Sequence, residues 1–288
     1  MKPGPFTYHD PGTVAEVVSL LASHEDAKLL AGGQSLMPMM NMRFVVPDHV
    51  IDLNGVGEMA GIADGGATLT IGAMTRQRDI MRSDAVAAKL PLAREALTWV
   101  GHFQTRNRGT IGGSLSHLDP AAELPLVCAA TDAVLTVEGP DGAREVPFAE
   151  WPLAYMMPSI GPDEVLTKIA LPVWSEPHGH GVVEFARRHG DFAIVSVAAM
   201  LAVSGGAITR AAVAIGGANT APIRLADTEA ALVGQPASDA TFAAAAADAK
   251  KIDAISDAYV SAAYRQRLAG VLTERALKQA AGRAAGGK

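Results

Sequence analysis

The sequence contains a single cysteine, Cys128, among its 288 residues. An internal disulfide is therefore excluded within this chain, and so is any iron–sulfur or zinc site built only from cysteine ligands. Acidic residues (30) outnumber Lys and Arg (24), which gives a net charge of −6. Nucleic acid binding needs clustered basic residues, so the composition gives no electrostatic reason to expect a nucleic acid partner.

Long apolar runs are also missing. None approaches the roughly 20 residues that span a bilayer, and the first residues lack the basic and apolar segments of a signal peptide. We therefore expect no transmembrane segment and a cytoplasmic location, which the single cysteine also fits. Aromatic residues make up only 5% of the chain, but 49% of it is hydrophobic. The length suffices for two or three domains with a sizeable buried core.

Hydrophobic periodicity predicts a mixed α and β chain. Thr13 and Glu16 form a capping box that begins a helix ending near His24. The remaining pattern predicts strands over residues 28–31, 67–72, 133–138, 143–146 and 164–171, with a hairpin turn at residues 139–142. It predicts helices over 35–43, 85–100 (broken at Pro91) and 121–130, and a helix that Thr75 caps and that runs through Met81. Residues 173–181 concentrate Pro, Gly and polar residues and predict a linker, followed by three strands and a helical tail from Thr228.

Two glycine pairs stand out along the chain. An apolar run stops at Gly32 and Gly33 and resumes with polar side chains, and a similar design recurs at Gly112 and Gly113. Glycine pairs after strands allow backbone N–H groups to approach phosphate oxygens, so two such segments predict a clamp on one phosphate-containing ligand. The alternative is an ordinary tight turn at each. Neither segment matches the GxGxxG fingerprint or the GxxxxGK[ST] loop, which disfavours a Rossmann domain or a nucleoside triphosphatase.

The second glycine segment is followed directly by an imidazole and two carboxylates, in His117, Asp119 and Glu123. Because carboxylates repel phosphate, we expect at least one of them to accept hydrogen bonds from a ribose or ribityl hydroxyl. The alternative is a helix start with Asp119 as N-cap, Pro120 at the first position and Glu123 in the first turn. A metal site from these three residues lacks a second histidine and is disfavoured.

Charged residues interrupt an apolar stretch at 187–193, which ends in Asp191, Phe192 and Ala193. Phe192 is suited to stacking on a flat ring, and a solvated turn between strands is the alternative. The neighbouring His178 and His180 are interpreted as surface residues of the linker. The sequence contains no nucleophile elbow, no HExxH and no kinase motif set, so hydrolytic chemistry has no support.

Taken together and in this order, residues 31–36, 110–114 and 187–193 resemble the FAD-binding medium subunit of the molybdenum hydroxylases. The resemblance covers nearly the full length. It implies an α+β fold, with a vanillyl-alcohol-oxidase (PCMH) type FAD-binding domain over residues 1–174, divided into subdomains of about 1–56 and 57–174. A C-terminal domain with a three-stranded sheet and helices is implied for residues 182–288.

The resemblance also implies roles for individual residues. The FAD diphosphate is expected to lie between the first segment and the second, and His117 is expected on the diphosphate side. Glu123 falls where many relatives have a ribose-binding Asp, Leu166 is expected near the adenine, and Phe192 stands where some relatives place a Tyr over the isoalloxazine. The two segments consist of Ala31, Gly32, Gly33, Gln34, Ser35 and Leu36, and of Thr110, Ile111, Gly112, Gly113 and Ser114.

For function, the resemblance implies an electron-transfer subunit with no catalytic residue of its own and no metal. A large subunit with molybdopterin cytosine dinucleotide and a small subunit with two [2Fe–2S] clusters are the implied partners, in a heterotrimer or a dimer of heterotrimers. Gln34 and Ser114 stand where carbon monoxide dehydrogenases often show His and Asn, which favours an aromatic N-heterocycle as substrate. Alternatives are a carbon monoxide dehydrogenase subunit, a stand-alone flavin oxidase or a non-catalytic scaffold.

Overall fold

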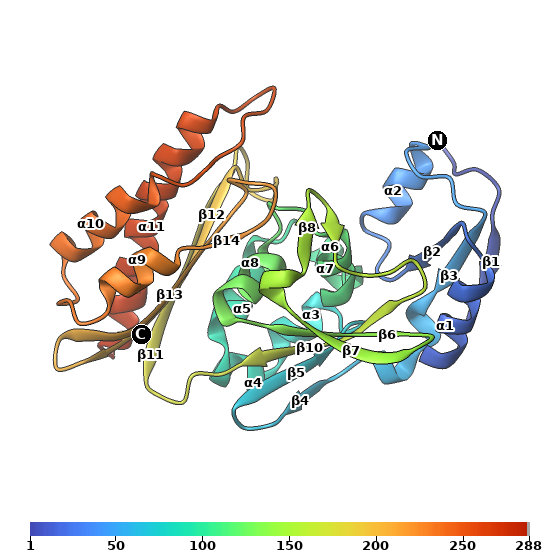
Figure 1. Ribbon diagram of the computed structural model, residues 1–288, viewed down its shortest axis with the longest axis horizontal. Helices are drawn as coiled ribbons and strands as arrows, with labels where there is room; N and C mark the ends of the chain where they lie inside the picture. The colour runs from blue at the N-terminus through green and yellow to red at the C-terminus, as the bar shows by residue number, and fades with distance from the viewer. Residues whose placement is uncertain (287–288) are drawn as a thin grey trace.

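The computed structural model describes residues 1–286 and arranges them as three consecutive α+β units (Figure 1). The first unit is a parallel three-stranded sheet in the order β1-β3-β2. Its elements are β1 (Thr7–His9), α1 (Val14–Ser23), β2 (Ala27–Leu30), α2 (Leu36–Asn41) and β3 (His49–Asp52). The predicted capping box is confirmed, because the Thr13 hydroxyl accepts from the Glu16 N–H while the Glu16 carboxylate accepts from the Thr13 N–H.

The second unit is an antiparallel five-stranded sheet in the order β4-β5-β10-β6-β7. The predicted hairpin is confirmed where Gly139 pairs with Gly142, and the predicted break at Pro91 separates two helices. Strands are β4 (Ile62–Asp64), β5 (Thr68–Gly72), β6 (Val134–Gly139), β7 (Gly142–Pro147), β8 (Pro152–Ala154), β9 (Met157–Pro158) and β10 (Val165–Pro172). Helices are α3 (Gln77–Arg82), α4 (Asp84–Lys89), α5 (Pro91–Trp99), α6 (Phe103–Arg108), α7 (Ile111–His117) and α8 (Glu123–Thr131).

The C-terminal unit is an antiparallel sheet in the order β11-β12-β13-β14, with helices on one face. Three long strands were expected, and a two-residue fourth strand extends the sheet. The elements are β11 (His178–Phe185), β12 (Val195–Ser204), β13 (Ala207–Gly216), β14 (Ile223–Arg224), α9 (Ala226–Leu232), α10 (Asp239–Ala249) and α11 (Ala262–Ala284). The last two residues of the predicted domain, 287 and 288, lie outside the described part of the chain.

Strand β12 is buried on both faces, which explains its apolar run from Val197 to Val203. Val195, Val197 and Leu201 pack into the core beneath the C-terminal helices, whereas Ala198 and Met200 belong to the core that the second unit supplies. In Figure 1, helices α9, α10 and α11 cover one side of this sheet and α5 and α8 lie toward the other. The second and third units are therefore joined by a continuous apolar layer.

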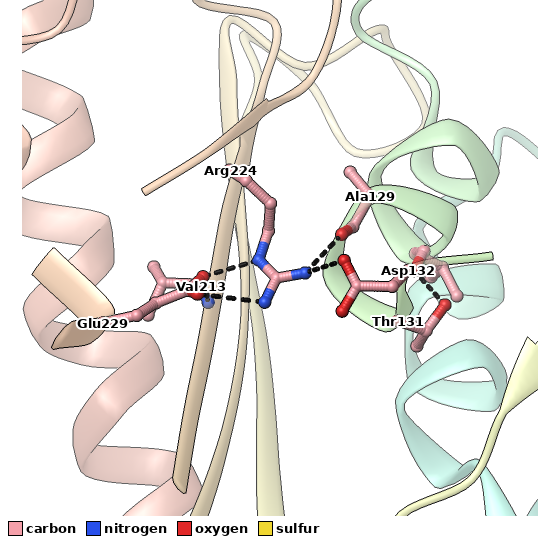
Figure 2. Close-up of polar contacts among 7 residues, drawn as sticks. Ala129, Thr131, Asp132, Val213, Arg224 and Glu229 are labelled. Atoms are coloured by element: carbon pink, nitrogen blue, oxygen red, sulfur yellow. Dashed lines mark hydrogen bonds and ion pairs between the residues drawn. The ribbon is translucent and has the colours of Figure 1, made fainter. Parts of the chain in front are cut away.

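Arg224 of β14 reinforces this junction, as Figure 2 shows. Its guanidinium donates to both carboxylate oxygens of Glu229, at 2.6 and 2.9 Å, and to the Asp132 carboxylate and the Ala129 carbonyl oxygen, at 2.6 and 3.0 Å. Because Ala129 and Asp132 belong to the end of α8 and Glu229 to α9, one side chain links the two units. Planar bidentate pairing of this kind fixes geometry as well as charge.

The interpretation of residues 178–181 as linker is wrong. These residues begin β11 and pair with β12, starting at His178 opposite Ala202. A Cβ atom on Gly181 would lie 2.5 Å from the Ala276 carbonyl oxygen of α11, so the glycines of this stretch allow a helix to approach the strand closely. His180 is half-buried rather than a surface residue, and its Nε2 lies 3.3 Å from the Glu95 carboxylate of α5.

Two helix starts also differ from expectation. Asp119 is not an N-cap: α7 ends with Leu118 in the left-handed region, the Asp119 carboxylate accepts from the Ala121 N–H at 2.8 Å, and α8 begins only at Glu123. Thr75 does not cap α3, because its hydroxyl is hydrogen-bonded to both backbone groups of Gly61. Among the described residues, no helix combines the length and apolar composition needed to span a bilayer.

Candidate functional site

The two glycine segments, which the sequence predicts to clamp one ligand, lie against each other. A Cβ atom on Gly32 would collide with the Arg108 carbonyl oxygen and would lie 2.9 Å from the Cα of Gly109. A Cβ atom on Gly113 would lie 3.5 Å from the Cβ of Ala31. The first segment leaves the parallel sheet of the first unit and the second opens α7 of the second unit, so the contact joins the two units.

The first segment presents free hydrogen-bond donors. Strand β2 ends at Leu30, the chain turns at Gly33 with φ of 73°, and α2 begins at Leu36. Among residues 1–286, the backbone N–H groups of Gly33, Gln34 and Ser35 find no acceptor. The Gln34 side chain turns back and donates to the Gly32 carbonyl oxygen at 3.2 Å. Neighbouring open amides on a turn are the arrangement that binds phosphate oxygens.

The second segment uses its donors inside the protein. The Ile111 N–H donates to the Thr75 carbonyl at 3.2 Å, the Gly112 N–H to the Ala73 carbonyl at 2.8 Å and the Gly113 N–H to the Thr110 hydroxyl at 3.0 Å. A Cβ atom on Gly112 would lie 2.5 Å from the Cβ of Ala73. This segment is therefore a closely packed wall beside the first one.

Arg76 and Asn54 bind the two segments together, and sequence reasoning missed both. The Arg76 guanidinium donates to the Arg108 carbonyl oxygen and to the Asn54 side-chain oxygen, while the Asn54 amide donates to the Ala31 carbonyl oxygen at 3.1 Å. Burial and the neighbouring charge of Arg108 lower the pKa of Arg76 from its ordinary value. The guanidinium groups of Arg76 and Arg108 place positive charge at the junction of the segments, which suits a diphosphate.

His117, Asp119 and Glu123 lie at the junction with the C-terminal unit, where the Gly217 N–H donates to the Pro120 carbonyl at 2.7 Å. Burial lowers the pKa of His117. Burial, with a further contribution from the charge of Asp119, raises the pKa of Glu123 to about 7. Three such residues do not form a shared ligand set: among the described residues, the only group with metal-ligand spacing lies elsewhere.

A second buried carboxyl faces this region from the C-terminal unit. Burial and the charge of Glu123 raise the pKa of Glu184 to about 8, and one of its carboxylate oxygens has no hydrogen-bond partner among residues 1–286. Nothing in the sequence pattern singled out Glu184. The one feature of the sequence that could have identified it is an acidic residue directly after the apolar pair Val182 and Val183 of β11.

The remaining predicted residues lie on other elements. Leu166 is buried in β10 next to a bulge between Leu166 and Lys168. Phe192 lies in the loop between β11 and β12 and is 68% exposed. That loop reaches the second unit, because a Cβ atom on Gly190 would lie 2.9 Å from the His102 ring. The predicted residues thus come from all three units, with the glycine segments in direct contact.

These features fit a dinucleotide cofactor. The glycine segments leave no room for Cβ atoms where they meet, open amides and two guanidinium groups provide diphosphate ligands, and a buried carboxyl with a raised pKa is available to a ribose hydroxyl. Gly33, Gln34 and Ser35 are the residues suited to hold the diphosphate.

Comparisons with known proteins agree over the whole length. Residues 4–174 match the FAD binding domain in molybdopterin dehydrogenase, and residues 182–280 match the CO dehydrogenase flavoprotein C-terminal domain. The chain is 38% identical to the 6-hydroxypseudooxynicotine dehydrogenase complex subunit alpha of Paenarthrobacter nicotinovorans, over 99% of this chain and 97% of that protein. It is 37% identical to the carbon monoxide dehydrogenase medium chain of Afipia carboxidovorans, over 99% of each.

A solved structure of carbon monoxide dehydrogenase from Hydrogenophaga pseudoflava superimposes with a TM-score of 0.95 and 38% identity, covering 98% of this chain and 99% of that chain. The matching family model describes an FAD-binding domain of molybdopterin dehydrogenases, and the relatives are single subunits or chains of dehydrogenases. The chain therefore belongs to the FAD-binding medium subunits of the molybdenum hydroxylases.

Proposed function

We propose that this chain transfers electrons within a three-subunit molybdenum hydroxylase, from the [2Fe–2S] small subunit to an external acceptor. The observation that carries the proposal is the contact between the two glycine segments, with open amides on one side and a packed wall on the other. When bound, the flavin supplies the redox chemistry, and the chain contributes binding, orientation and electrostatics.

Each part of the site has a role in holding the cofactor. The N–H groups of Gly33, Gln34 and Ser35 donate to the diphosphate, and the guanidinium groups of Arg76 and Arg108 offset its charge. Residues 110–114 pack beside the first segment and fix its position, with His117 at the diphosphate side. Glu123 accepts from a ribose hydroxyl, Leu166 contacts the adenine, and Phe192 covers one face of the flavin ring.

Electrons reach this chain from a partner. Its one cysteine, Cys128, is fully buried, and burial raises the pKa of the thiol, so it cannot supply the ligand set of an iron–sulfur cluster. The substrate is oxidised on the large subunit, at the molybdenum cofactor. A cytoplasmic location and a heterotrimer, or a dimer of heterotrimers, complete the proposal.

The proposed substrate is an aromatic N-heterocycle. Two observations support this class. The chain is similar to a subunit of a 6-hydroxypseudooxynicotine dehydrogenase complex, and Gln34 and Ser114 stand where carbon monoxide dehydrogenases often show His and Asn. Carbon monoxide is the second candidate, supported by the similar identity to the Afipia medium chain and by the superposition. This subunit does not touch the substrate, so residues of the large subunit decide between the two.

Co-purification with a large molybdopterin-binding subunit and a small [2Fe–2S] subunit from the same organism tests the function. Under anaerobic conditions, a pyridine- or purine-type heterocycle is expected to bleach the flavin absorbance at about 450 nm in the complex. The isolated chain is expected to stay yellow with the same substrate. Bleaching of the isolated chain would support a stand-alone oxidase instead. Bleaching of the complex by carbon monoxide but by no heterocycle would overturn the proposed substrate class.

A further inference from the structure

Three histidines distant in the sequence meet at one end of the first sheet. His9 ends β1, His24 is the C-cap of α1, and His49 begins β3. The Nε2 of His9 lies 3.0 Å from the Nδ1 of His49, and the rings of His24 and His49 are stacked with centroids 3.9 Å apart. All three side chains are partly buried, and one ring nitrogen from each lies within 4.8 Å of the others.

This spacing suits a shared metal ion. Imidazole nitrogens bind zinc at about 2.0–2.1 Å, so tetrahedral ligands are roughly 3.3–3.4 Å apart. The Nε2 of His9 and the Nδ1 of His49 are 3.0 Å apart, and the ligand atoms of the three histidines all lie within 4.8 Å of one another, which is close to that value. Three protein ligands leave a fourth position for water, and a set made only of imidazoles favours Zn²⁺, Ni²⁺ or Cu²⁺ over Mg²⁺ or Ca²⁺.

The cluster is separate from the FAD site. In the parallel register, Ala27 of β2 pairs with His49 and Leu30 pairs with Asp52. His49 therefore lies where β3 begins, about 10 Å along the strands from the end of β2 at about 3.3 Å per residue. His9 of β1 is opposite Ile51, and β3 separates β1 from β2. A metal at the cluster neither contacts the diphosphate loop nor depends on bound FAD.

We propose that His9, His24 and His49 bind one Zn²⁺ ion, which fastens β1 and the end of α1 to β3. Each ligand belongs to a different element of the first unit, so the ion ties together the sheet from which the diphosphate loop projects. Because the three elements come together only in the folded chain, bound metal stabilises the folded state. Without metal, the same residues are stacked rings joined by one hydrogen bond.

The test uses the untagged full-length chain, stripped with a chelator and dialysed. We expect the wild type to take up one Zn²⁺ per chain in competition with a chromophoric chelator, and its thermal midpoint to rise with saturating Zn²⁺. His24→Gln and His49→Gln are each expected to lower the affinity at least about tenfold and to abolish the rise. His178→Gln, which changes a half-buried histidine of the C-terminal unit, is the matched control and should behave as wild type.

Circular dichroism and FAD content of the metal-free variants show whether they are folded. The two substituted residues belong to different elements, because His24 ends α1 and His49 begins β3. Wild-type uptake that does not saturate at one Zn²⁺ per chain would overturn the proposal. Uptake by both folded variants with wild-type affinity would overturn it as well. Either result would leave the stacked rings as a packing feature only.

Discussion

The two glycine segments share a sequence design but differ in what their backbone does. Residues 31–36 turn through a glycine with positive φ, and three consecutive N–H groups there find no acceptor in the described part of the chain. In residues 110–114, backbone N–H groups donate to the carbonyl oxygens of Thr75 and Ala73 and to the Thr110 hydroxyl. The first segment is therefore suited to bind a ligand directly, and the second to hold the first in place. A glycine pair in a sequence does not by itself distinguish these roles.

Gly112→Ala is expected to have the largest effect of the substitutions that separate the two roles. The new Cβ would lie 2.5 Å from the Ala73 Cβ and 2.7 Å from the Ala73 carbonyl oxygen. The backbone of Ala73 cannot move away as a flexible side chain could. Overpacking of this kind costs about 1–3 kcal/mol, so thermal unfolding should show a midpoint lower by roughly 5 °C. Gly282→Ala, where a Cβ would meet nothing within 4 Å, should leave the midpoint unchanged or slightly higher.

Gly33→Ala probes the ligand-binding segment. An alanine at φ of 73° costs about 1–2 kcal/mol, and relief of that strain moves the open amides. FAD affinity, measured by fluorescence titration, should fall about tenfold. The matched control is Gly66→Ala, at φ of 83° in a hairpin turn with no atom near the new Cβ. Equal loss of FAD affinity in both variants would show that strain alone, and not the position of the loop, explains the result.

Glu123 links cofactor binding to pH. Its pKa of about 7 means that the carboxyl is mostly protonated below pH 7 in the FAD-free chain. A ribose hydroxyl that donates to the carboxylate favours the ionised form, so FAD affinity should rise by up to about tenfold as pH increases toward 7 and then level off. Glu123→Gln should remove most of this rise. A flat wild-type profile between pH 5.5 and 8 would contradict the ribose contact.

The same pKa has an opposite consequence for the stability of the FAD-free chain. A folded-state pKa above the ordinary value of 4.5 means that the folded chain holds its proton longer than the unfolded chain. Stability is therefore expected to fall as pH rises from about 4.5 through 7, and the fall should be smaller in Glu123→Gln. Glu184 acts with the same sign, so some of the fall should remain. Glu150→Gln, at an exposed position, is the control.

Gln34→Ala is expected to have the smallest effect. The Gln34 amide donates to the Gly32 carbonyl oxygen at 3.2 Å, and a hydrogen bond of this type contributes about 0.5–1.5 kcal/mol. FAD affinity should fall about two- to tenfold, and the thermal midpoint of the FAD-free chain should fall by only a few degrees. A larger loss would mean that the side chain contacts the cofactor itself.

The sequence predicted the features that depend on neighbouring residues. The capping box at Thr13, the break at Pro91 and the hairpin at residues 139–142 were all confirmed, because each needs only local backbone preferences and side chains a few positions apart. The predicted clamp of both glycine segments on one ligand stays a prediction, and the structure shows the two segments in direct contact.

Features that depend on tertiary packing were missed. Arg76 and Asn54 belong to no motif, and they become neighbours only when the first two units meet. Residues 178–181 have the composition of a linker, but the absence of Cβ atoms at Gly179 and Gly181 is what admits α11 against β11. In each case a long-range contact decided the outcome.

Equilibrium titration of the FAD-free chain with FAD tests the central claim most directly. We expect the wild type and Gly282→Ala to bind one FAD per chain with equal affinity. Gly32→Ala, whose Cβ would collide with the Arg108 carbonyl where the two segments meet, should bind at least about tenfold more weakly while keeping its secondary structure. A folded wild-type chain that binds no FAD, or a Gly32→Ala variant with unchanged affinity, would contradict the assignment of FAD to these two segments.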